Sequence, residues 1–560
     1  MIEVESRWGL SKKGKFWFGT EEMVFPNILY IDDDRINEYV RADIDGISLS
    51  DSEDSDLTVS SSIFKENGFS IQRSFGYPDL IGGDVVERSP SSSFFQVLYD
   101  QEPRDSAGIY VIANAPELFT SPKYFVDKII SIRKKIAYHK LLYAPGIARP
   151  NNIALLSYLG IELFDTIYCD LMSARGVTTT DWLGMDSQEP GDNRSLLRNE
   201  LDIVEKSIER GRIRDLVETR VRSEPRLVEM LRYADKYYDD YSYNIPVTGG
   251  DLCVTTFEGL YRPDIQRFRN RLRERYVPPE RGVLLLLPCS ARKPYFQSKT
   301  HGIIRGAINQ GNWTDVQEVI LTSPMGSVPR DIEMFYPAKQ YDIPVSHKWL
   351  EEEKRIILET LEIIIERGDY RTIICHLPPD MDFVRENIDC IDTVKGEHPT
   401  DKKALENLAE SVVKNTKPGR SHQGFLHQNI TSFAEFQFGP AGGKLTEGAV
   451  IKGRYPNYRI MKEEDQIGML VAERGLISLT LSGGEILLNE DEYVVEIDDF
   501  RPKGTVFAVG VMDADKKICP EDDCVLAHEG ELKGVGAAIM SGREMKSSER
   551  GGAVRSRHYV

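Results

Sequence analysis

The feature that most constrains the fold is an uninterrupted apolar run, Val-Leu-Leu-Leu-Leu at residues 283–287, which ends at Pro288. A strand with apolar side chains on both faces must be covered on both faces, as in parallel sheets enclosed by helices. Similar apolar runs at residues 319–322 and 372–375 are its expected neighbours. The run therefore predicts the central strand of an α/β domain with a parallel sheet.

Further domains surround this one, because 560 residues exceed what one hydrophobic core can hold. Short strand-like runs alternate with amphipathic helices before residue 170, which indicates parallel βα units in a barrel or a doubly wound sheet. In the last 70 residues, short β runs separated by glycines are typical of a small β barrel. We therefore predict an α/β multidomain protein divided at 1–245, 246–400, 401–490 and 491–560, the third part being a small α+β connecting domain.

Composition favours a water-soluble, cytoplasmic protein without a membrane partner. No apolar run approaches the roughly 20 residues that span a bilayer, and the first residues lack the basic and apolar segments of a secretory signal. The seven cysteines are odd in number and widely spaced, unlike a disulfide framework. Cys519 and Cys524 lack a second pair, so we expect no metal site.

The formal charge of −19 opposes nucleic-acid binding, which needs Lys and Arg against phosphates. Binding depends on local patches, however, and two segments are basic: residues 267–275, with five arginines, and residues 543–558. The basic residues of the second segment are Arg543, Lys546, Arg550, Arg555 and Arg557. A solvated surface is the alternative interpretation, and charge alone leaves the choice open.

The densest group of reactive side chains lies directly after the apolar run, where ligands of α/β sheets collect. It holds a thiol, an ammonium, a phenol, a hydroxyl and an imidazole: Cys289, Lys293, Tyr295, Ser298 and His301. Cys289 is a candidate nucleophile where cationic neighbours favour its thiolate, and His301 a candidate for proton transfer near neutral pH. The alternative is a buried structural cysteine, with His301 a cap or surface residue.

A second candidate loop, residues 322–330, follows the next apolar strand and should open on the same edge of the sheet. Its small residues could let a ligand approach the backbone, which makes Ser323, Met325, Gly326 and Arg330 candidate ligand-binding residues. An ordinary connecting loop fits equally well. A third candidate is Asp165, a carboxylate at the end of a predicted strand, which is either catalytic or part of a salt bridge.

The first of these loops matches a known family. Pro288-Cys289, Lys293-Pro294-Tyr295, Ser298 and His301 resemble the proline-cysteine, lysine-proline-tyrosine, serine and histidine motif of archaeosine synthases. The segments 323–326, 328–330 and 341–345 also look like that family. The resemblance covers nearly the whole chain.

That family is related to tRNA-guanine transglycosylases, and the resemblance implies a degenerate transglycosylase-like TIM barrel at 1–245. Residues 160–165 resemble the segment with the nucleophilic aspartate, at the position of Asp165. Residues 91–97 resemble the base-binding segment, but Ser91 replaces its aspartate, and no closely spaced cysteine trio for zinc follows Asp165. These losses put base exchange in doubt, and the resemblance leaves Asp165, Gln96 and Phe95 to hold the modified base or the tRNA.

The last domain resembles a PUA domain, on residues 535–538, 551–554 and His558. This resemblance implies RNA binding by a β barrel. Its basic tail would grip A-form RNA through phosphates, with Arg543, Lys546, Arg555 and Arg557 as the expected contacts.

The reaction implied by the resemblance converts a nitrile into an amidine, on 7-cyano-7-deazaguanine (preQ0) at position 15 in the D-loop of tRNA. A thiolate at Cys289 would form a thioimidate that an amine displaces, with His301 or Tyr295 supplying protons. Lys293 would stabilise negative charge or orient the amine donor, and the 322–330 residues would bind that donor.

The resemblance implies free lysine as donor, with the adduct cleaved by a separate radical-SAM lyase partner. Glutamine or ammonia, giving archaeosine directly, are the alternatives. The chain has no cysteine trio for an iron–sulfur cluster and no recognisable glutaminase module, which favours lysine and predicts no cofactor in this chain. A homodimer, an active transglycosylase and a non-catalytic tRNA-binding protein all stay open at this stage.

Overall fold

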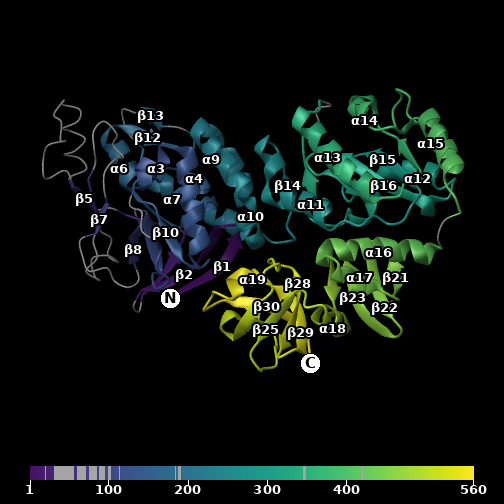
Figure 1. The fold of residues 1–560 in the computed structure, drawn as a ribbon. Helices are drawn as coiled ribbons and strands as arrows, with labels where there is room; N and C mark the ends of the chain where they lie inside the picture. The colour runs from purple at the N-terminus through teal and green to yellow at the C-terminus, as the bar shows by residue number, and fades with distance from the viewer. Residues whose placement is uncertain are drawn as a thin grey trace. The chain divides into compact units, whose positions relative to one another are not determined.

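The computed structural model describes residues 1–18, 21–30, 56–59, 71–74, 85–87, 95–98, 102–112, 114–182, 184–186, 191–344, 348–418 and 421–560. Contacts divide the chain into two compact units (Figure 1). The first comprises Met1–Ile245 with Phe507–Val509 and Arg543–Gly552, and the second Pro246–Val506, Gly510–Gly542 and Ala553–Val560. No helix in the described residues is long and apolar enough to cross a membrane.

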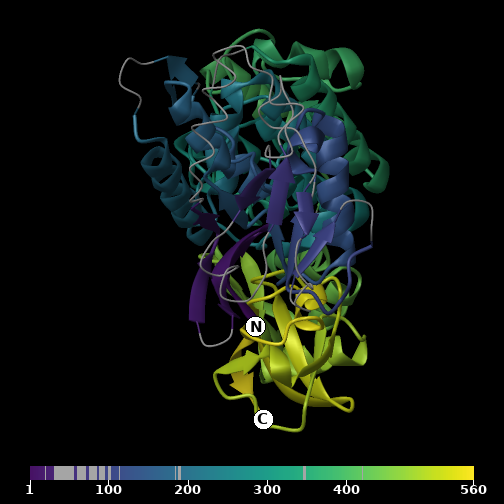
Figure 2. The same ribbon diagram turned by 90° about the vertical axis from the view of Figure 1, so that its left-hand side faces the viewer.

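The first unit is built around five parallel strands, flanked by helices in Figure 2. Their order is β4 (Asn27–Leu29), β11 (Leu163–Asp165), β10 (Leu141–Tyr143), β9 (Ile109–Ile112) and β8 (Phe95–Leu98). Within the described residues no ladder joins the edge strands β4 and β8. The parallel βα units are present, whereas the TIM barrel stays a prediction.

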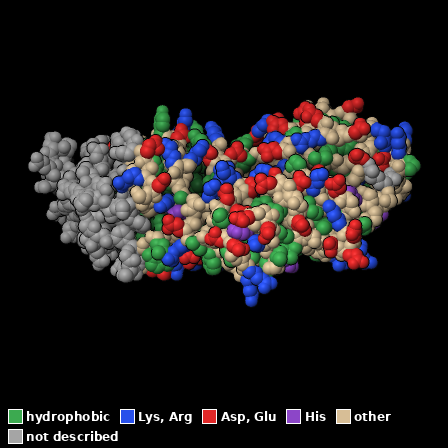
Figure 3. All heavy atoms as spheres, turned by 60° about the horizontal axis from the view of Figure 1, so that its bottom comes forward, with side chains coloured by type: hydrophobic (Ala, Val, Ile, Leu, Met, Phe, Trp, Pro, Cys, Tyr) green, Lys and Arg blue, Asp and Glu red, His purple; other side chains and the backbone are tan. Residues whose placement is uncertain are grey.

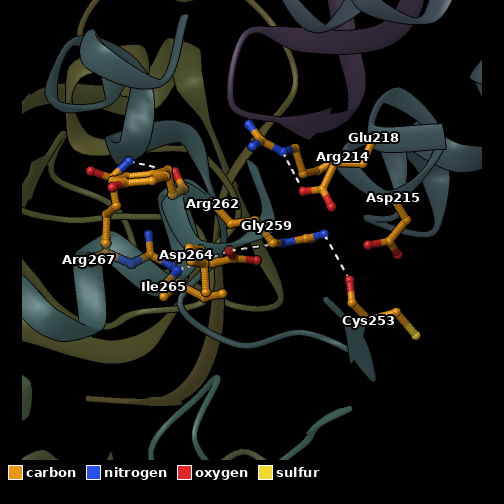
Figure 4. Close-up of polar contacts among 12 residues, drawn as sticks. Arg214, Asp215, Glu218, Cys253, Gly259, Arg262, Asp264, Ile265 and Arg267 are labelled. Atoms are coloured by element: carbon orange, nitrogen blue, oxygen red, sulfur yellow. Dashed lines mark hydrogen bonds and ion pairs between the residues drawn. The ribbon is translucent and has the colours of Figure 1, made fainter. Parts of the chain in front are cut away.

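Helices and an antiparallel sheet complete this unit. The sheet holds β1 (Ile2–Trp8), β2 (Ser11–Phe18) and β3 (Glu21–Phe25), and the helices include α4 (Pro122–Lys135), α5 (Ile153–Tyr158), α7 (Asn193–Glu209), α8 (Ile213–Arg220) and α9 (Pro225–Lys236). The buried guanidinium of Arg214, on α8, is neutralised by Glu218 at 2.8 Å (Figure 4) and by Asp235 of α9. Such a buried cation is tolerated because both of its carboxylate partners are buried with it.

The second unit contains the predicted α/β domain. Its sheet has the order β17 (Gly326–Pro329), β16 (Val316–Thr322), β15 (Val283–Pro288), β19 (Thr372–Cys375) and β20 (Ile391–Asp392). The run at residues 283–287 is confirmed as its central strand: every residue is fully buried, and β16 and β19 pair with it in parallel. Full burial of each such side chain contributes about 1.5–3 kcal/mol, so this strand anchors the loop that follows it.

Helices cover this sheet and extend its core beyond residue 400. Val283, Leu285 and Leu287 pack with α12 (Lys299–Ile308) and α15 (Lys402–Asn415), while α13 (Glu351–Arg367) lies against β17. The boundary predicted at residue 400 therefore separates α15 from the core on which it packs. The sequence of an amphipathic helix such as α15 shows which of its residues are buried but not which sheet they cover.

The arginine-rich segment 267–275 is not a solvated face throughout, because two of its arginines are buried. It lies on α11 (Pro263–Glu274), where Arg269 and Arg271 are 5% exposed. Arg269 donates to the Leu260 carbonyl at 2.6 Å, and the Arg271 guanidinium lies 5.1 Å from the Phe335 ring centroid. Just before α11, Arg262 contacts Asp264 and the Cys253 carbonyl (Figure 4).

Two further parts follow in the second unit. Helices α16 (His422–Phe438), α17 (Ala441–Thr446) and α18 (Leu481–Asn489) accompany an antiparallel sheet of β21 (Val450–Arg454), β22 (Asn457–Lys462), β23 (Asp465–Val471) and β24 (Leu476–Leu479). A six-stranded sheet then has the order β26 (Thr505–Phe507), β30 (Gly552–Tyr559), β29 (Glu531–Ala538), β28 (Asp523–His528), β25 (Val494–Ile497) and β27 (Val511–Ala514).

Candidate active site

The Cys289 loop begins where β15 ends, at the carboxyl edge of the parallel sheet. Pro288 pairs with Leu321 of β16, which brings Cys289 beside Thr322 at the end of that strand. The predicted opening of the two loops on one edge is thereby confirmed. Thr322 forms a hydrogen bond with the half-buried thiol of Cys289. The thiol therefore lies at the carboxyl edge of the sheet and not in the hydrophobic core.

A cluster of hydroxyl groups surrounds this thiol. The Tyr341 hydroxyl forms hydrogen bonds with the hydroxyls of both Tyr295 and Thr322. Burial raises the pKa of Tyr295 and of Tyr341 well above the usual range, so both phenols are protonated. Each hydroxyl can donate or accept, which gives the cluster the capacity to deliver a proton to a bound substrate.

Lys293 supplies the positive charge of the site. Its ammonium lies 4.1 Å from the Tyr341 ring centroid, a cation–π contact. Burial lowers the pKa of Lys293, although Cys289 and Asp342 oppose this shift. Burial raises the pKa of Cys289, partly offset by Thr322 and Lys293. The proton affinities of thiol and amine are thus brought closer together, a condition for proton transfer between them.

His301 is placed to hold the loop rather than to move protons. Its ring is fully buried: Nδ1 accepts from Arg330 at 2.7 Å, and Nε2 lies 3.1 Å from the Pro288 carbonyl oxygen. A guanidinium only donates, so Nδ1 carries no proton and Nε2–H donates to Pro288. Burial, assisted by the positive charge of Arg330, lowers the pKa of His301 to about 3. Ser298 likewise caps α12, accepting from the His301 backbone N–H at 3.1 Å.

The second loop contributes less to ligand binding than its composition suggests. Arg330 is held by Glu318 at 2.7 Å and by Glu333 at 2.8 Å, so its guanidinium serves the protein. Met325 is fully buried. Gly326 has φ +87°, and a Cβ there would lie 2.4 Å from the Thr360 Oγ1, so packing against α13 requires this glycine. Ser323 differs: its buried Oγ has no hydrogen-bond partner in the described residues.

Two participants were missed from the sequence. Tyr341 lies on β18 (Tyr341–Asp342), which pairs with β14 (Leu252–Cys253) outside the main sheet, so local patterns did not place it beside Cys289. Asp380 follows β19, and its charge acts on the Cys289 thiol. The same-edge argument that located Thr322 applies equally to β19 and would have identified Asp380.

Two candidate residues of the first unit, Asp165 and Gln96, are engaged in structural hydrogen bonds. The fully buried Asp165 accepts from the Tyr143 hydroxyl at 2.7 Å, from Gly146 N–H at 2.8 Å and from Ile167 N–H at 3.1 Å. The Gln96 amide bonds the backbone of Glu102 and Arg104. Phe95 begins β8, and Ser91 lies outside the described residues. Asp165 and Gln96 are thus bound to their own domain.

Some residues of the basic tail are exposed, and others are held by contacts within the protein. Arg557 makes a two-point contact with buried Asp523, including a bond of 2.9 Å, and so is structural. The Arg543 guanidinium lies 4.2 Å from the Tyr243 ring centroid. Lys546 and Arg555 are exposed, as a phosphate-binding role requires.

Comparison with known proteins identifies the family. A model described as a domain of unknown function (DUF5591) matches residues 265–412, and a PUA domain model matches residues 497–560. An archaeosine synthase subunit alpha of Thermoplasma acidophilum is 34% identical over 515 residues, covering 90% of this chain and 97% of the relative. A protein of the same name in Methanosarcina acetivorans is 34% identical, covering 80% of this chain and 79% of the relative.

A more distant relative is the tRNA-guanine(15) transglycosylase of Methanobrevibacter smithii, 24% identical over 84% of this chain and 75% of the relative. The transglycosylase kinship inferred from residues 160–165 is thereby confirmed. The DUF5591 match contains the whole Cys289 loop, and the PUA match lies within the β-barrel domain predicted at 491–560. The chain belongs to the archaeosine synthase family and carries a PUA domain at residues 497–560.

Proposed function

We propose that this protein is a tRNA-modifying transferase of archaeosine biosynthesis, which adds an amine to the nitrile of preQ0 at position 15 in tRNA. The names of its relatives, archaeosine synthase and tRNA-guanine(15) transglycosylase, support the tRNA substrate and the modified product. The observation that carries the reaction is the grouping of a thiol, an amine and three linked hydroxyls at the carboxyl edge of one sheet.

The chemistry begins with the Cys289 thiol. Cys289 attacks as the thiolate that the Lys293 ammonium favours, and the sulfur bonds to the nitrile carbon. The carbon–nitrogen triple bond becomes a double bond, and the Tyr295–Tyr341–Thr322 hydroxyls donate a proton to the nitrogen. The product is a thioimidate, and no oxidant or reductant is consumed.

An amine then attacks the thioimidate carbon and gives up one proton, which restores the hydroxyl cluster, and the sulfur leaves as a thiolate beside the Lys293 ammonium. The net change is addition of the amine across the nitrile to give an amidine. His301 takes no proton in this scheme, because both of its nitrogens are engaged. It positions the peptide that precedes Cys289.

Free L-lysine is the donor we favour. Ser323 Oγ, buried and unpartnered in the described residues, is suited to bind a polar group of the donor, and the Asp380 carboxylate is suited to attract an ammonium. A lysine adduct would require a separate radical-SAM lyase to release archaeosine. Base exchange is disfavoured because Asp165, at the position of the transglycosylase nucleophile, is enclosed by hydrogen-bond donors.

Mass spectrometry of nucleosides tests the reaction and the donor together. Purified protein is incubated with preQ0-bearing tRNA and labelled lysine, glutamine or ammonium in separate reactions. We expect label from lysine on the deazaguanine nucleoside. Label from glutamine or ammonium would identify a direct amidinotransferase instead, and no mass change with any donor would overturn the synthase proposal. Cys289→Ala should lose most of this activity. Its matched control is Cys253→Ala, which removes a thiol outside the site.

A further inference from the structure

The hairpin of β21 and β22 presents three cations on one face. Lys452 stands opposite Arg459 in the ladder, and Arg454 opposite Asn457, so these positions share a face. Ile451 and Ile460 point to the other face and are buried. Lys452, Arg454 and Arg459, which we name the hairpin cations, are exposed, and none forms an ion pair within the described residues.

These cations stand out against the rest of the surface. The chain carries a net charge of −19, and acidic and basic side chains are interspersed over the face shown in Figure 3. The basic side chains on that face thus lie among carboxylates, whereas phosphate binding needs cations that are free to exchange their counterions. The hairpin cations meet that requirement.

The turn of the same hairpin reaches into the active-site domain. The Tyr455 hydroxyl donates to Glu333 Oε1 at 2.9 Å, and its ring lies 4.2 Å from the Phe296 ring, centroid to centroid. Glu333 is fully buried and also accepts from the Phe296 backbone N–H at 3.2 Å. Tyr455 thus contacts both Phe296 and the carboxylate that supports Arg330.

From Glu333 the contacts continue without interruption to the candidate nucleophile. Arg330 donates to Glu333 at 2.8 Å and to His301 Nδ1 at 2.7 Å. His301 donates from Nε2 to the Pro288 carbonyl at 3.1 Å, and Pro288 precedes Cys289. Every residue in this series of contacts is buried or half-buried. A displacement of Tyr455 would therefore change the hydrogen-bond partners of Glu333 within the protein.

We propose that the hairpin cations bind the phosphate backbone of tRNA and that Tyr455 is a positioning residue which couples this binding to the Cys289 loop. The identity of the RNA rests on the proposed function, whereas the coupling rests on the contacts alone. The hairpin then links recognition of the RNA to the geometry of the thiol.

The RNA surface is tested by Lys452→Ala/Arg454→Ala/Arg459→Ala. The matched control is Lys402→Ala/Lys403→Ala/Lys414→Ala, which removes the same charge from exposed positions on α15. Each lost phosphate contact reduces the slope of log affinity against log salt by about 1. We expect the hairpin variant to lose a slope of about 3 and the control to keep its slope. Equal slopes in the two variants would overturn the proposed surface.

The coupling is tested by alkylation of Cys289 with iodoacetamide, measured by peptide mass spectrometry with Cys253 as internal reference. The added RNA is a short duplex without a D-loop, so that it does not carry the modified base to the thiol. We expect the duplex to change the Cys289 rate about threefold or more in the native protein, an energy near 0.6 kcal/mol. Tyr455→Phe, which keeps the ring and removes the hydroxyl, should bind the duplex normally but lose this response.

An unchanged response in Tyr455→Phe, or no response in the native protein, would overturn the coupling. The readout needs no amine transfer, so the two proposals fail separately. If the native protein forms no amidine but the duplex still changes the alkylation rate of Cys289, the proposed reaction is contradicted. If the protein forms the amidine but the duplex leaves that rate unchanged, the coupling is contradicted.

Discussion

Both units of the molecule place a potential nucleophile at the end of a buried parallel strand, yet the two surroundings differ. Asp165 is the last residue of β11 and accepts hydrogen bonds from Tyr143, Gly146 and Ile167 of its own domain. Cys289 follows β15 and lies near the Lys293 amine and the hydroxyl of Thr322, which belongs to the cluster of hydroxyls that can exchange protons. A position at a strand end is therefore insufficient for reactivity. Whether the nucleophile can attack a substrate depends on how many hydrogen-bond donors of the protein it already binds.

The sharpest way to break this comparison is to remove each nucleophile and measure amidine formation. Cys289→Ala should reduce the rate by about 10³-fold or more, because it removes the attacking atom. Asp165→Asn should leave the rate within about tenfold once the protein is folded, since that carboxylate serves structure. A large loss in Asp165→Asn with unchanged stability would place chemistry in the first unit.

The order of the two effects should be reversed for stability: substitution of Asp165 should lower the free energy of unfolding more than substitution of Cys289. Asp165→Ala leaves the Tyr143 hydroxyl and two backbone N–H groups without an acceptor, and each unsatisfied buried donor costs about 1–3 kcal/mol. We expect chemical denaturation to report a loss of about 3 kcal/mol or more. Cys289→Ser should change the free energy of unfolding by less than about 1 kcal/mol, because the site is only half-buried.

Acid should weaken the second unit through His301. This histidine has a pKa near 3 when folded and about 6.5 when unfolded, so below pH 6.5 the unfolded state binds the extra proton. Its contribution is complete above pH 6.5 and is lost as the pH falls toward 3. Between pH 7 and pH 5 the cost is about 2 kcal/mol, seen in the pH dependence of unfolding. His301→Gln should flatten this dependence, and an equally steep curve in that variant would assign it elsewhere.

The smallest expected effect concerns the charge at Lys293. An adjacent cation favours the thiolate, so Lys293→Met should raise the pKa of Cys289 further above its usual range. The alkylation rate of Cys289 at pH 8 should then fall by a few fold, with its pH profile displaced upward. Tyr295→Phe retains the charge and should not displace the profile. A downward displacement in Lys293→Met would mean that the amine is neutral in the resting site.

The comparison also shows what the sequence can and cannot reveal. The apolar run at residues 283–287 specified a buried parallel strand, and the same-edge argument brought Cys289 and Thr322 together. Tyr341 was missed because its strand pairs with β14, a long-range contact without a local signature. Local composition likewise gave no warning that Arg271 on α11 is buried, since a charged residue is normally exposed.

Hydrogen-bond saturation is the other property that sequence did not provide. Gly326, Arg330, Gln96 and His301 have the residue types of a binding or catalytic site, but their packing or hydrogen-bond partners lie elsewhere in the same unit. The resemblance to archaeosine synthases identified the motif as a whole. It did not distinguish Cys289 and Lys293, which face the site, from Ser298 and His301, which hold it in place.

The most direct test of the account is detection of a covalent adduct at Cys289. The protein is incubated with preQ0-bearing tRNA and no amine donor, then digested with nuclease and mapped by peptide mass spectrometry. The account predicts a nucleoside attached to the Cys289 peptide, absent in Cys289→Ala, retained in Asp165→Asn and discharged by lysine. An adduct on the Asp165 peptide, or amidine formation by Cys289→Ala at the native rate, would contradict it.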